Sequence, residues 1–270
     1  LANNQDFRGQ VNFIFQPAEE GIGGAKAMIE DGLFEQFPCD TLYAMHNAPK
    51  MKIGALAAIA GVRTAAGAFF DIDITGKGAH GAMPNQGVDP VIIAGELIIA
   101  LQSIVSRNIN PGQTAVLSIT QVHAGDAYNV IPGSARLSGT VRTLDMKLMA
   151  RIETRVREMV SGICAAHGAT GIVDYRITFH TVQNDATVSA FAADVCDELV
   201  GKENVYREGN PGTGSEDFSF MSEQVPSCYL NLGNGKDSHS LHNHDYDFND
   251  EALSYGASFF ARVVEKSLTE

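Results

Sequence analysis

The feature that most constrains the fold is a run of alternating strand and helix patterns between residues 65 and 181. Apolar and polar side chains alternate in FFDIDIT, as in a half-exposed strand, and two long amphipathic helices follow at intervals. The six elements are predicted at residues 69–75, 88–107, 114–123, 135–142, 145–167 and 172–179. Their order, β-α-β-β-α-β, is that of a ferredoxin-like sandwich. We therefore expect residues 65–181 to form an inserted α+β domain.

Within this block, the spacing of apolar residues predicts which faces are buried. The first helix should place Ile92, Leu97, Leu101 and Ile104 on its apolar side. The second helix has Asp145 as a candidate N-cap and Gly168 as a candidate C-cap.

The flanking segments, 1–64 and 182–270, have a different pattern, in which helices and buried strands alternate. We predict strands at 11–15, 41–46 and 227–232, helices at 22–33, 188–200 and 251–267, and a hairpin-like piece at 53–61. This pattern predicts an α/β domain that the chain leaves at residue 64 and re-enters at residue 182.

Charge and cysteine content limit the function classes. A formal charge of −13 over 270 residues argues against nucleic acid and anionic membrane surfaces, because both would repel the chain. No unbroken apolar run reaches the roughly 18 residues of a membrane span. The four cysteines are scattered without a CxxC pair, so we expect free thiols in a reducing, cytoplasmic environment.

Two adjacent carboxylates, Glu19 and Glu20, follow the predicted strand at 11–15. Strand ends of this kind carry the active sites of open α/β sheets. In such a pair, one carboxylate can bind a metal while the other transfers a proton. The alternative is a solvated acidic turn before a helix.

Histidines follow two further elements of the same domain. His46 ends the strand at 41–46, and His239, His242 and His244 lie together in the segment 238–250. Imidazole and carboxylate together suit zinc, manganese, cobalt or nickel. Alternatively, His46 is a hydrogen-bonded structural residue and the three other histidines belong to a solvated loop.

Six motifs in this order resemble the M20 metallopeptidase family, from about residue 11 to the C-terminus. They are FQPAEEG, YAMHNAP, GKGAHGAMPNQGVDP, YNVIPGSARLSGTVR, GSEDFS and LHNHDYDFND. The branch they resemble is the amidohydrolase subgroup, which includes hippurate hydrolases and hydrolases of auxin–amino acid conjugates. The resemblance implies a zinc-exopeptidase-like three-layer α/β/α catalytic domain with an inserted lid and dimerisation domain.

The resemblance also implies roles for individual residues. Glu19 corresponds to the general base that acts on a metal-activated water, and Glu20, His46 and His242 correspond to metal ligands. The implied reaction is cleavage of the amide bond of N-acyl or aryl-acyl amino acids, with two zinc or manganese ions in the complete site.

In the inserted domain, the resemblance assigns His80 and Asn129 to oxyanion stabilisation from the partner subunit of a homodimer. It assigns Arg142 to the free carboxylate of the substrate. Without the resemblance, these three would be a turn histidine, a turn asparagine and a strand arginine paired with an acid. Gly212, Gly214, Ser215 and Glu216 match a loop that lines the pocket of the family, and Glu216 and Asp217 receive no catalytic role.

Two departures from the family pattern are present. His244 stands where a proline usually follows the LHN motif, and we expect it to be a surface residue. The Cys-Gly-His-Asp motif that supplies further ligands upstream of the glutamate pair does not occur in these 270 residues, which start at Leu1. We therefore expect a partial gene product with weak metal occupancy and little activity.

Two other hypotheses remain open. The chain could be a non-catalytic dimerisation or binding module with a vestigial metal site, which metal analysis would distinguish from the hydrolase. A cysteine-nucleophile amidase is less favoured, because no cysteine lies in a motif with a histidine.

Overall fold

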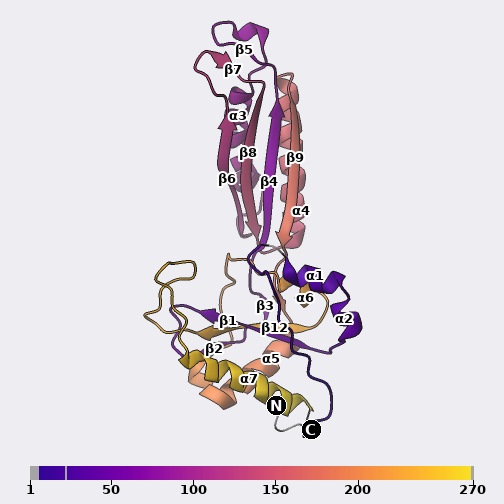
Figure 1. The fold of residues 1–270 in the computed structure, drawn as a ribbon, viewed down its shortest axis with the longest axis vertical. Coiled ribbons are helices and arrows are strands. Elements are labelled where there is room, and N and C mark those ends of the chain that lie inside the picture. The colour runs from indigo at the N-terminus through magenta and orange to yellow at the C-terminus, as the bar shows by residue number, and fades with distance from the viewer. Residues whose placement is uncertain (1–5, 22, 269–270) are drawn as a thin grey trace. The chain divides into compact units, whose positions relative to one another are not determined.

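The computed structural model describes residues 6–21 and 23–268. The chain divides into two compact units (Figure 1). The first unit comprises Leu1–Arg63, Val182–Gly212 and Glu216–Glu270, and the second comprises Thr64–Thr181 and Thr213–Ser215. The chain is thus of the α/β class, and each unit has its own apolar core.

The second unit is built on a four-stranded antiparallel sheet with the strand order β6-β8-β4-β9. This is the strand order of a ferredoxin-like sandwich. A separate two-stranded ribbon pairs β5 with β7. The elements are β4 (Ala66–Thr75), β5 (Ala79–His80), the 3₁₀ helix η1 (Pro84–Gln86), α3 (Pro90–Asn108), β6 (Ala115–Ala124), β7 (Val130–Ile131), β8 (Ser134–Thr143), α4 (Met146–Ala166) and β9 (Thr170–Phe179).

Helices α3 and α4 pack against one face of this sheet, as the alternation in β4 predicts. Phe70, Ile72 and Ile74 are fully buried, and each such side chain contributes about 1.5–3 kcal/mol. The packing at Gly139 of β8 is so close that a Cβ atom there would lie 2.4 Å from the Phe70 ring. Asp145 caps α4 as predicted, accepting from the backbone N–H of the second and third residues of the helix.

The predicted phase of α3 is wrong at one position. Ile92 is 62 % exposed, whereas its neighbour Ile93 is 1 % exposed and joins Leu97, Leu101 and Ile104 in the core. The helix begins at Pro90 with Asp89 as its cap, and the i, i+4 series that faces the sheet starts from Ile93.

Helix α3 also has the length and hydropathy of a membrane span, the one such helix within the described ranges, although Glu96, Gln102 and Ser103 interrupt its apolar runs. Its buried residues lie in the core of the second unit, as in the core helix of a globular domain.

The first unit has helices on both faces of a sheet with the strand order β1-β12-β2-β11. Strands β1 and β12 are parallel, from Leu42 opposite Ser227 to Ala48 opposite Gly233. A short ribbon pairs β3 with β10. The elements are α1 (Gly24–Glu30), α2 (Leu33–Gln36), β1 (Leu42–Ala48), β2 (Leu56–Ala57), β3 (Gly61–Val62), β10 (Gln183–Asn184), α5 (Ala186–Val200), the 3₁₀ helix η2 (Lys202–Asn204), β11 (Val205–Tyr206), α6 (Ser219–Ser222), β12 (Ser227–Gly233) and α7 (Glu251–Leu268).

Strand β12 shows how this unit is layered. Its alternate residues Cys228, Leu230 and Leu232 belong to the cluster under α5 and α7. Tyr229, between them, belongs to a second cluster with residues of α1, α2 and α6. The sheet is therefore the middle layer of an α/β/α arrangement, as expected from the family resemblance.

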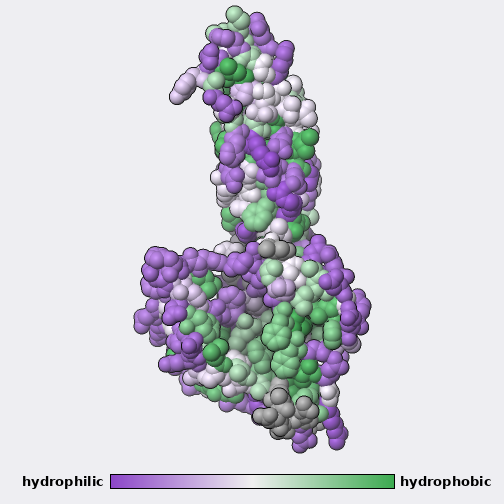
Figure 2. Space-filling view, viewed as in Figure 1, coloured by the Kyte–Doolittle hydropathy of each residue, from purple (hydrophilic) through white to green (hydrophobic). Residues whose placement is uncertain are grey.

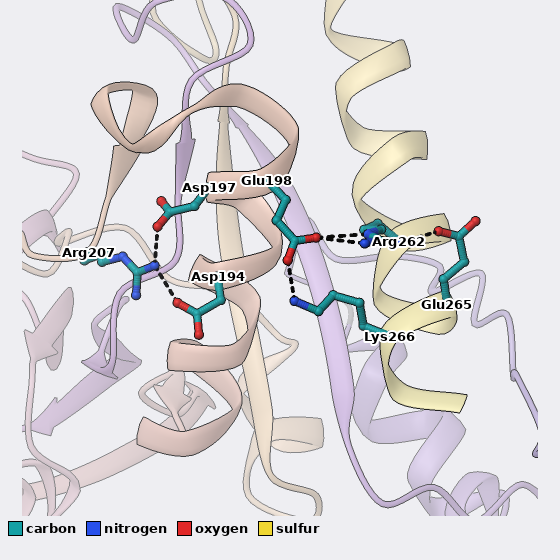
Figure 3. A network of polar contacts seen from close by, with 7 residues as sticks. All are labelled: Asp194, Asp197, Glu198, Arg207, Arg262, Glu265 and Lys266. Carbon is teal, nitrogen blue, oxygen red and sulfur yellow. Dashed lines mark hydrogen bonds and ion pairs between the residues drawn. The ribbon is translucent and has the colours of Figure 1, made fainter. Parts of the chain in front are cut away.

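Charged pairs join α5 to its neighbours at the surface (Figure 3). Glu198 of α5 pairs with Arg262 at 3.0 Å and Lys266 at 2.5 Å, both from α7. Arg207, which follows β11, pairs with Asp194 and Asp197 at 2.7 Å each. Because most of these groups are at least partly exposed, solvent screens the pairs and we expect them to contribute little to stability.

The predicted strand at 11–15 is wrong, because the structure has no strand there. Ile14 packs against the second cluster, but Phe13 and Phe15 are 67 % and 87 % exposed. In the part of the chain that the structure describes, no strand pairs with this segment, and β1 lies at the edge of the sheet. A strand is stabilised by backbone hydrogen bonds to a partner strand, and the sequence of a segment does not show whether such a partner is present. Figure 2 shows apolar surface over part of this unit.

The predicted hairpin-like piece at 53–61 is also wrong. Its two short strands do not pair with each other: β2 pairs with β12 and β11, and β3 pairs with β10.

Candidate active site

Glu19 lies in a loop of the first unit that follows the segment 11–15. Ala18, just before it, has a positive φ of 54°, which turns the chain. One carboxylate oxygen from each of Glu19, Glu216 and Asp217 lies within 4.8 Å of the other two. Three acidic groups from two distant segments therefore meet at one place.

Hydrogen bonds hold the two buried members of this acidic group. Asp217 accepts from the side-chain amide of Gln16 and, at 2.9 Å, from the backbone N–H of Ala25 in α1. Glu216 accepts from the backbone N–H of Phe218 at 3.1 Å and from the Tyr229 hydroxyl at 3.2 Å. Both carboxylates are therefore held by bonds within the loop and to neighbouring elements.

Burial and the neighbouring carboxylates shift the pKa values of Glu19 and Asp217. Burial, and then the nearby charges of Glu216, Asp217 and Glu20, raises the pKa of Glu19 to about 7, while His46 acts in the opposite direction. Burial also raises the pKa of Asp217. Glu19 can thus both accept and release a proton near neutral pH, which is what a general acid–base requires.

His46 lies in β1, close to its carboxyl end. Its Nδ1 atom is 2.7 Å from the backbone carbonyl oxygen of Asn47. When Nδ1 carries the proton and donates to this carbonyl, the lone pair of Nε2 is free. Metal-binding histidines in proteins are usually held in this way.

The other expected ligands lie in exposed segments. Glu20 is an exposed residue of the turn after Glu19, and His242 has a positive φ of 61° in an exposed turn. Among the described residues, the one group of metal-type side chains within 4.8 Å is Glu19, Glu216 and Asp217, which does not contain Glu20, His46 or His242. His244 is exposed and pairs with Asp245 at 3.2 Å.

In the second unit, the β5–β7 ribbon brings His80 and Asn129 together. His80 pairs with Val130, and the backbone N–H of Gly81 donates to the carbonyl of Asn129 at 2.8 Å. Both His80 and Asn129 are exposed.

Arg142 lies near the far end of β8. Its Nη1 atom donates to the Thr140 hydroxyl at 2.5 Å and to the Val141 carbonyl at 3.0 Å, and its guanidinium lies 5.4 Å from the centre of the Phe69 ring. Burial lowers its pKa. No carboxylate pairs with Arg142 within residues 6–21 and 23–268, so the alternative of a strand arginine paired with an acid is not observed.

Comparison with known proteins places these residues in a family. The sequence profile of Peptidase family M20/M25/M40 matches residues 1–266. The chain belongs to this family. The resemblance inferred from the motifs is confirmed, and the chain is a member of a family of amide-bond hydrolases.

Curated relatives include a hydrolase and a deacetylase of N-acyl compounds by name. Hippurate hydrolase of Campylobacter jejuni is 39 % identical over 265 residues, which cover 98 % of this chain and 69 % of that protein. N-acetylcysteine deacetylase of Bacillus subtilis is 36 % identical over 96 % of this chain and 67 % of that protein. The chain therefore spans about two thirds of the length of these relatives.

Two solved structures share the fold. A protein from methicillin-resistant Staphylococcus aureus has a TM-score of 0.90 and 28 % identity, covering 97 % of this chain and 68 % of that one. A dinuclear metal-binding M20 peptidase from Bacillus subtilis has a TM-score of 0.81 and 30 % identity, covering 99 % of this chain and 67 % of that one.

Sequence reasoning missed the contact of Glu216 and Asp217 with Glu19. The acidic pair after a glycine-rich loop was a visible signal, but 196 or more residues of sequence separate it from Glu19. Only the fold of the first unit shows that the two segments meet.

Proposed function

We propose that this M20 chain carries a metal-dependent hydrolase site for the amide bond of N-acyl or aryl-acyl amino acids. The observation that carries the proposal is the Glu19 carboxyl group, held against Glu216 and Asp217 in a member of this family. The relatives named hippurate hydrolase and N-acetylcysteine deacetylase support the substrate class.

Glu20, His46 and His242 are the residues that we propose to hold divalent metal, zinc or manganese. The arrangement of His46 Nδ1 against a carbonyl fits a metal ligand, and the dinuclear relative supports a two-ion centre. When bound, such an ion activates a water molecule and polarises a carbonyl group.

Glu19 moves the proton in this proposal. Its raised pKa lets it take a proton from the attacking water and return the proton to the leaving amine. Glu216 and Asp217 support Glu19 electrostatically, because their negative charges raise its proton affinity.

Arg142 would bind the free carboxylate of the substrate. A half-buried guanidinium without an acidic partner is a good receptor for an anion, and arginine binds carboxylates through two parallel hydrogen bonds.

His80 and Asn129 would stabilise the oxyanion of a site formed with a second copy of the chain. They adjoin the start of β8 at Ser134, whereas Arg142 is eight residues further along the same strand. Eight residues of strand span roughly 26 Å, which is longer than a small N-acyl amino acid. One substrate that contacts all three residues therefore needs them from two subunits.

A homodimer through the second unit is supported by the edge strand β6. In the described part of the chain β6 pairs with β8 alone, and its sequence AVLSITQVHA contains no Asp, Glu, Lys or Arg. Edge strands that stay unpaired are usually protected by charges. Val122 of β6 is 53 % exposed and Ile99 of the adjacent α3 is 76 % exposed.

These 270 residues alone should bind metal weakly and turn over slowly, because they supply three expected ligands, too few for two ions.

The second hypothesis, a binding and dimerisation module without catalysis, is favoured by the fact that Glu20, His46 and His242 do not lie in one close group. The four free cysteines are consistent with a site that works in the reducing cytosol.

Hydrolysis of hippurate and N-acetyl amino acids, measured by mass spectrometry with added zinc or manganese, tests the proposal. We expect slow, metal-dependent release of the amino acid that Glu19→Gln abolishes. Equal rates of hydrolysis for the unsubstituted chain and Glu19→Gln, or hydrolysis that persists after chelation of the metal, would contradict the proposal. Metal and substrate binding without any turnover would favour the second hypothesis.

A further inference from the structure

Gly67 of β4 occupies a position that the backbone does not require to be glycine. It lies near the start of β4, opposite Arg142 on one side and Phe179 on the other, where the register with β9 shifts between Gly67 and Ala68, and it is not among the glycines with a positive φ. Glycine weakens a strand, so a glycine here indicates a close approach by another group.

The groups that approach Gly67 are two polar side chains. A Cβ atom at Gly67 would lie 3.0 Å from Nη1 of Arg142 and 3.0 Å from Oγ of Ser215. The guanidinium and the hydroxyl therefore occupy the space that a side chain at Gly67 would fill.

Ser215 contributes a hydroxyl that the structure leaves unused. Its Oγ atom is buried and has no hydrogen-bond partner among the described residues. The segment 213–215 is attached to the second unit by a backbone bond instead, from the N–H of Ala65 to the carbonyl of Gly214 at 2.8 Å. The Ser215 side chain is thus not needed for this attachment.

The hydrogen bonds of Arg142 involve one side of its guanidinium group. The hydrogen bonds to Thr140 and Val141 both come from Nη1, and the donors at Nε and Nη2 have no partner within the described ranges. The pair Nε–H and Nη2–H is one of the two edges of a guanidinium that can bind both oxygens of a carboxylate. Anchoring Nη1 leaves that edge available.

We propose that Gly67 and Ser215 position the Arg142 guanidinium and thereby set the preference of the site for substrates with a free carboxylate. The absence of a side chain at Gly67 leaves room for Nη1 of Arg142. The Ser215 hydroxyl lies at the edge of the same space and can accept a hydrogen bond from an N–H group. The inference rests on the proposed role of Arg142, and both residues act through Arg142 rather than on the reacting amide bond.

The test measures binding to Arg142 directly, without turnover. The chain is labelled with ¹⁵N-arginine and kept free of metal by chelation, and the Nε–H signal of Arg142 is assigned with Arg142→Lys. Hippurate is then titrated, with hippuramide, which has no free carboxylate, as the matched ligand. We expect hippurate to shift this signal and hippuramide to leave it unchanged.

Ser215→Ala and Gly67→Ala then test the positioning role. We expect each to raise the Kd for hippurate about 3- to 10-fold, the range of one weakened hydrogen bond. Both changes should be tolerated by the fold, because the first removes a buried hydroxyl without a partner and the second meets the ends of flexible side chains. Thr154→Ala, at an exposed position of α4, is the control and should leave the Kd unchanged.

The outcomes distinguish a failure of the proposed role of Arg142 from a failure of the positioning role of Gly67 and Ser215. No response of the Arg142 signal to hippurate in the unsubstituted chain would contradict the carboxylate contact in the proposed function, and this inference with it. A response with the same Kd in Ser215→Ala and Gly67→Ala would overturn this inference alone.

Discussion

The side chain of Asn184 forms hydrogen bonds to both backbone groups of Tyr229. Its amide donates to the Tyr229 carbonyl at 2.9 Å, and its oxygen accepts the Tyr229 N–H at 2.7 Å. The same amide also donates to the carbonyl of Ile59 at 2.8 Å. Since the Tyr229 hydroxyl donates to Glu216, this buried asparagine is connected to the acidic group of the candidate active site.

Asn184→Ala should therefore be strongly destabilising. It leaves two carbonyls and one N–H buried without their partner, and we expect the free energy of unfolding to fall by about 3 kcal/mol. Urea unfolding followed by circular dichroism measures this, with Gln113→Ala in an exposed turn as the control. Equal stability of the two variants would contradict the role of Asn184.

Glu19→Gln should remove most of the hydrolytic activity while leaving the fold intact. Loss of a general acid–base lowers kcat by about 10²- to 10⁴-fold. Initial rates of hippurate hydrolysis with saturating metal measure the effect, and Glu35→Gln, at an exposed position of α2, is the matched control. A loss of less than threefold would show that Glu19 does not move the proton.

Asp71 should make the second unit sensitive to acid. A hydrogen bond from Ser138, and then the Arg176 guanidinium, lowers the pKa of Asp71 from 3.8 to about 2. Because the folded pKa is below the unfolded one, this stabilisation is complete above about pH 4 and is lost as the pH falls towards 2. We expect about 1 kcal/mol, since the partner arginines are half exposed.

Urea unfolding of Asp71→Asn and the unsubstituted chain between pH 7 and pH 2 measures this contribution. The difference in stability should be present at pH 7 and disappear near pH 2. A difference that is constant over this range would contradict the assignment.

Ile99→Glu should disrupt the proposed dimer. A charge on the exposed apolar face of α3, beside the edge strand β6, would be buried on association without a partner. Light scattering after size exclusion should change from twice the chain mass of 28.9 kDa to that mass. Ile172→Lys, at an exposed site on the opposite edge strand β9, should leave the dimer unchanged.

The sequence predicted the second unit better than the first, for a physical reason. The apolar alternation of β4 and the capping by Asp145 are local signals, and the structure confirms both. The phase of α3 failed at Ile92, because a helix rich in apolar residues on several faces does not show which face meets the sheet. The segment 11–15 failed because a strand depends on a partner elsewhere in the chain.

The site was predicted in part. The motifs identified Glu19 and its family, but the contact of Glu19 with Glu216 and Asp217 depends on how α1, β12 and the glycine-rich loop pack together. The role of Gly67 was also invisible in the sequence, because it depends on two side chains that approach β4 from other segments.

The central claim is that His46 and His242 hold a divalent metal, and a titration with Mn²⁺ followed by histidine-ring NMR tests it most directly. Paramagnetic broadening detects even weak binding, and His123 and His167 of the second unit serve as internal controls. We predict that the signals of His46 and His242 broaden first and that Glu20→Gln weakens the effect. Unchanged His46 and His242 signals, or equal broadening of all histidines, would contradict the metal site.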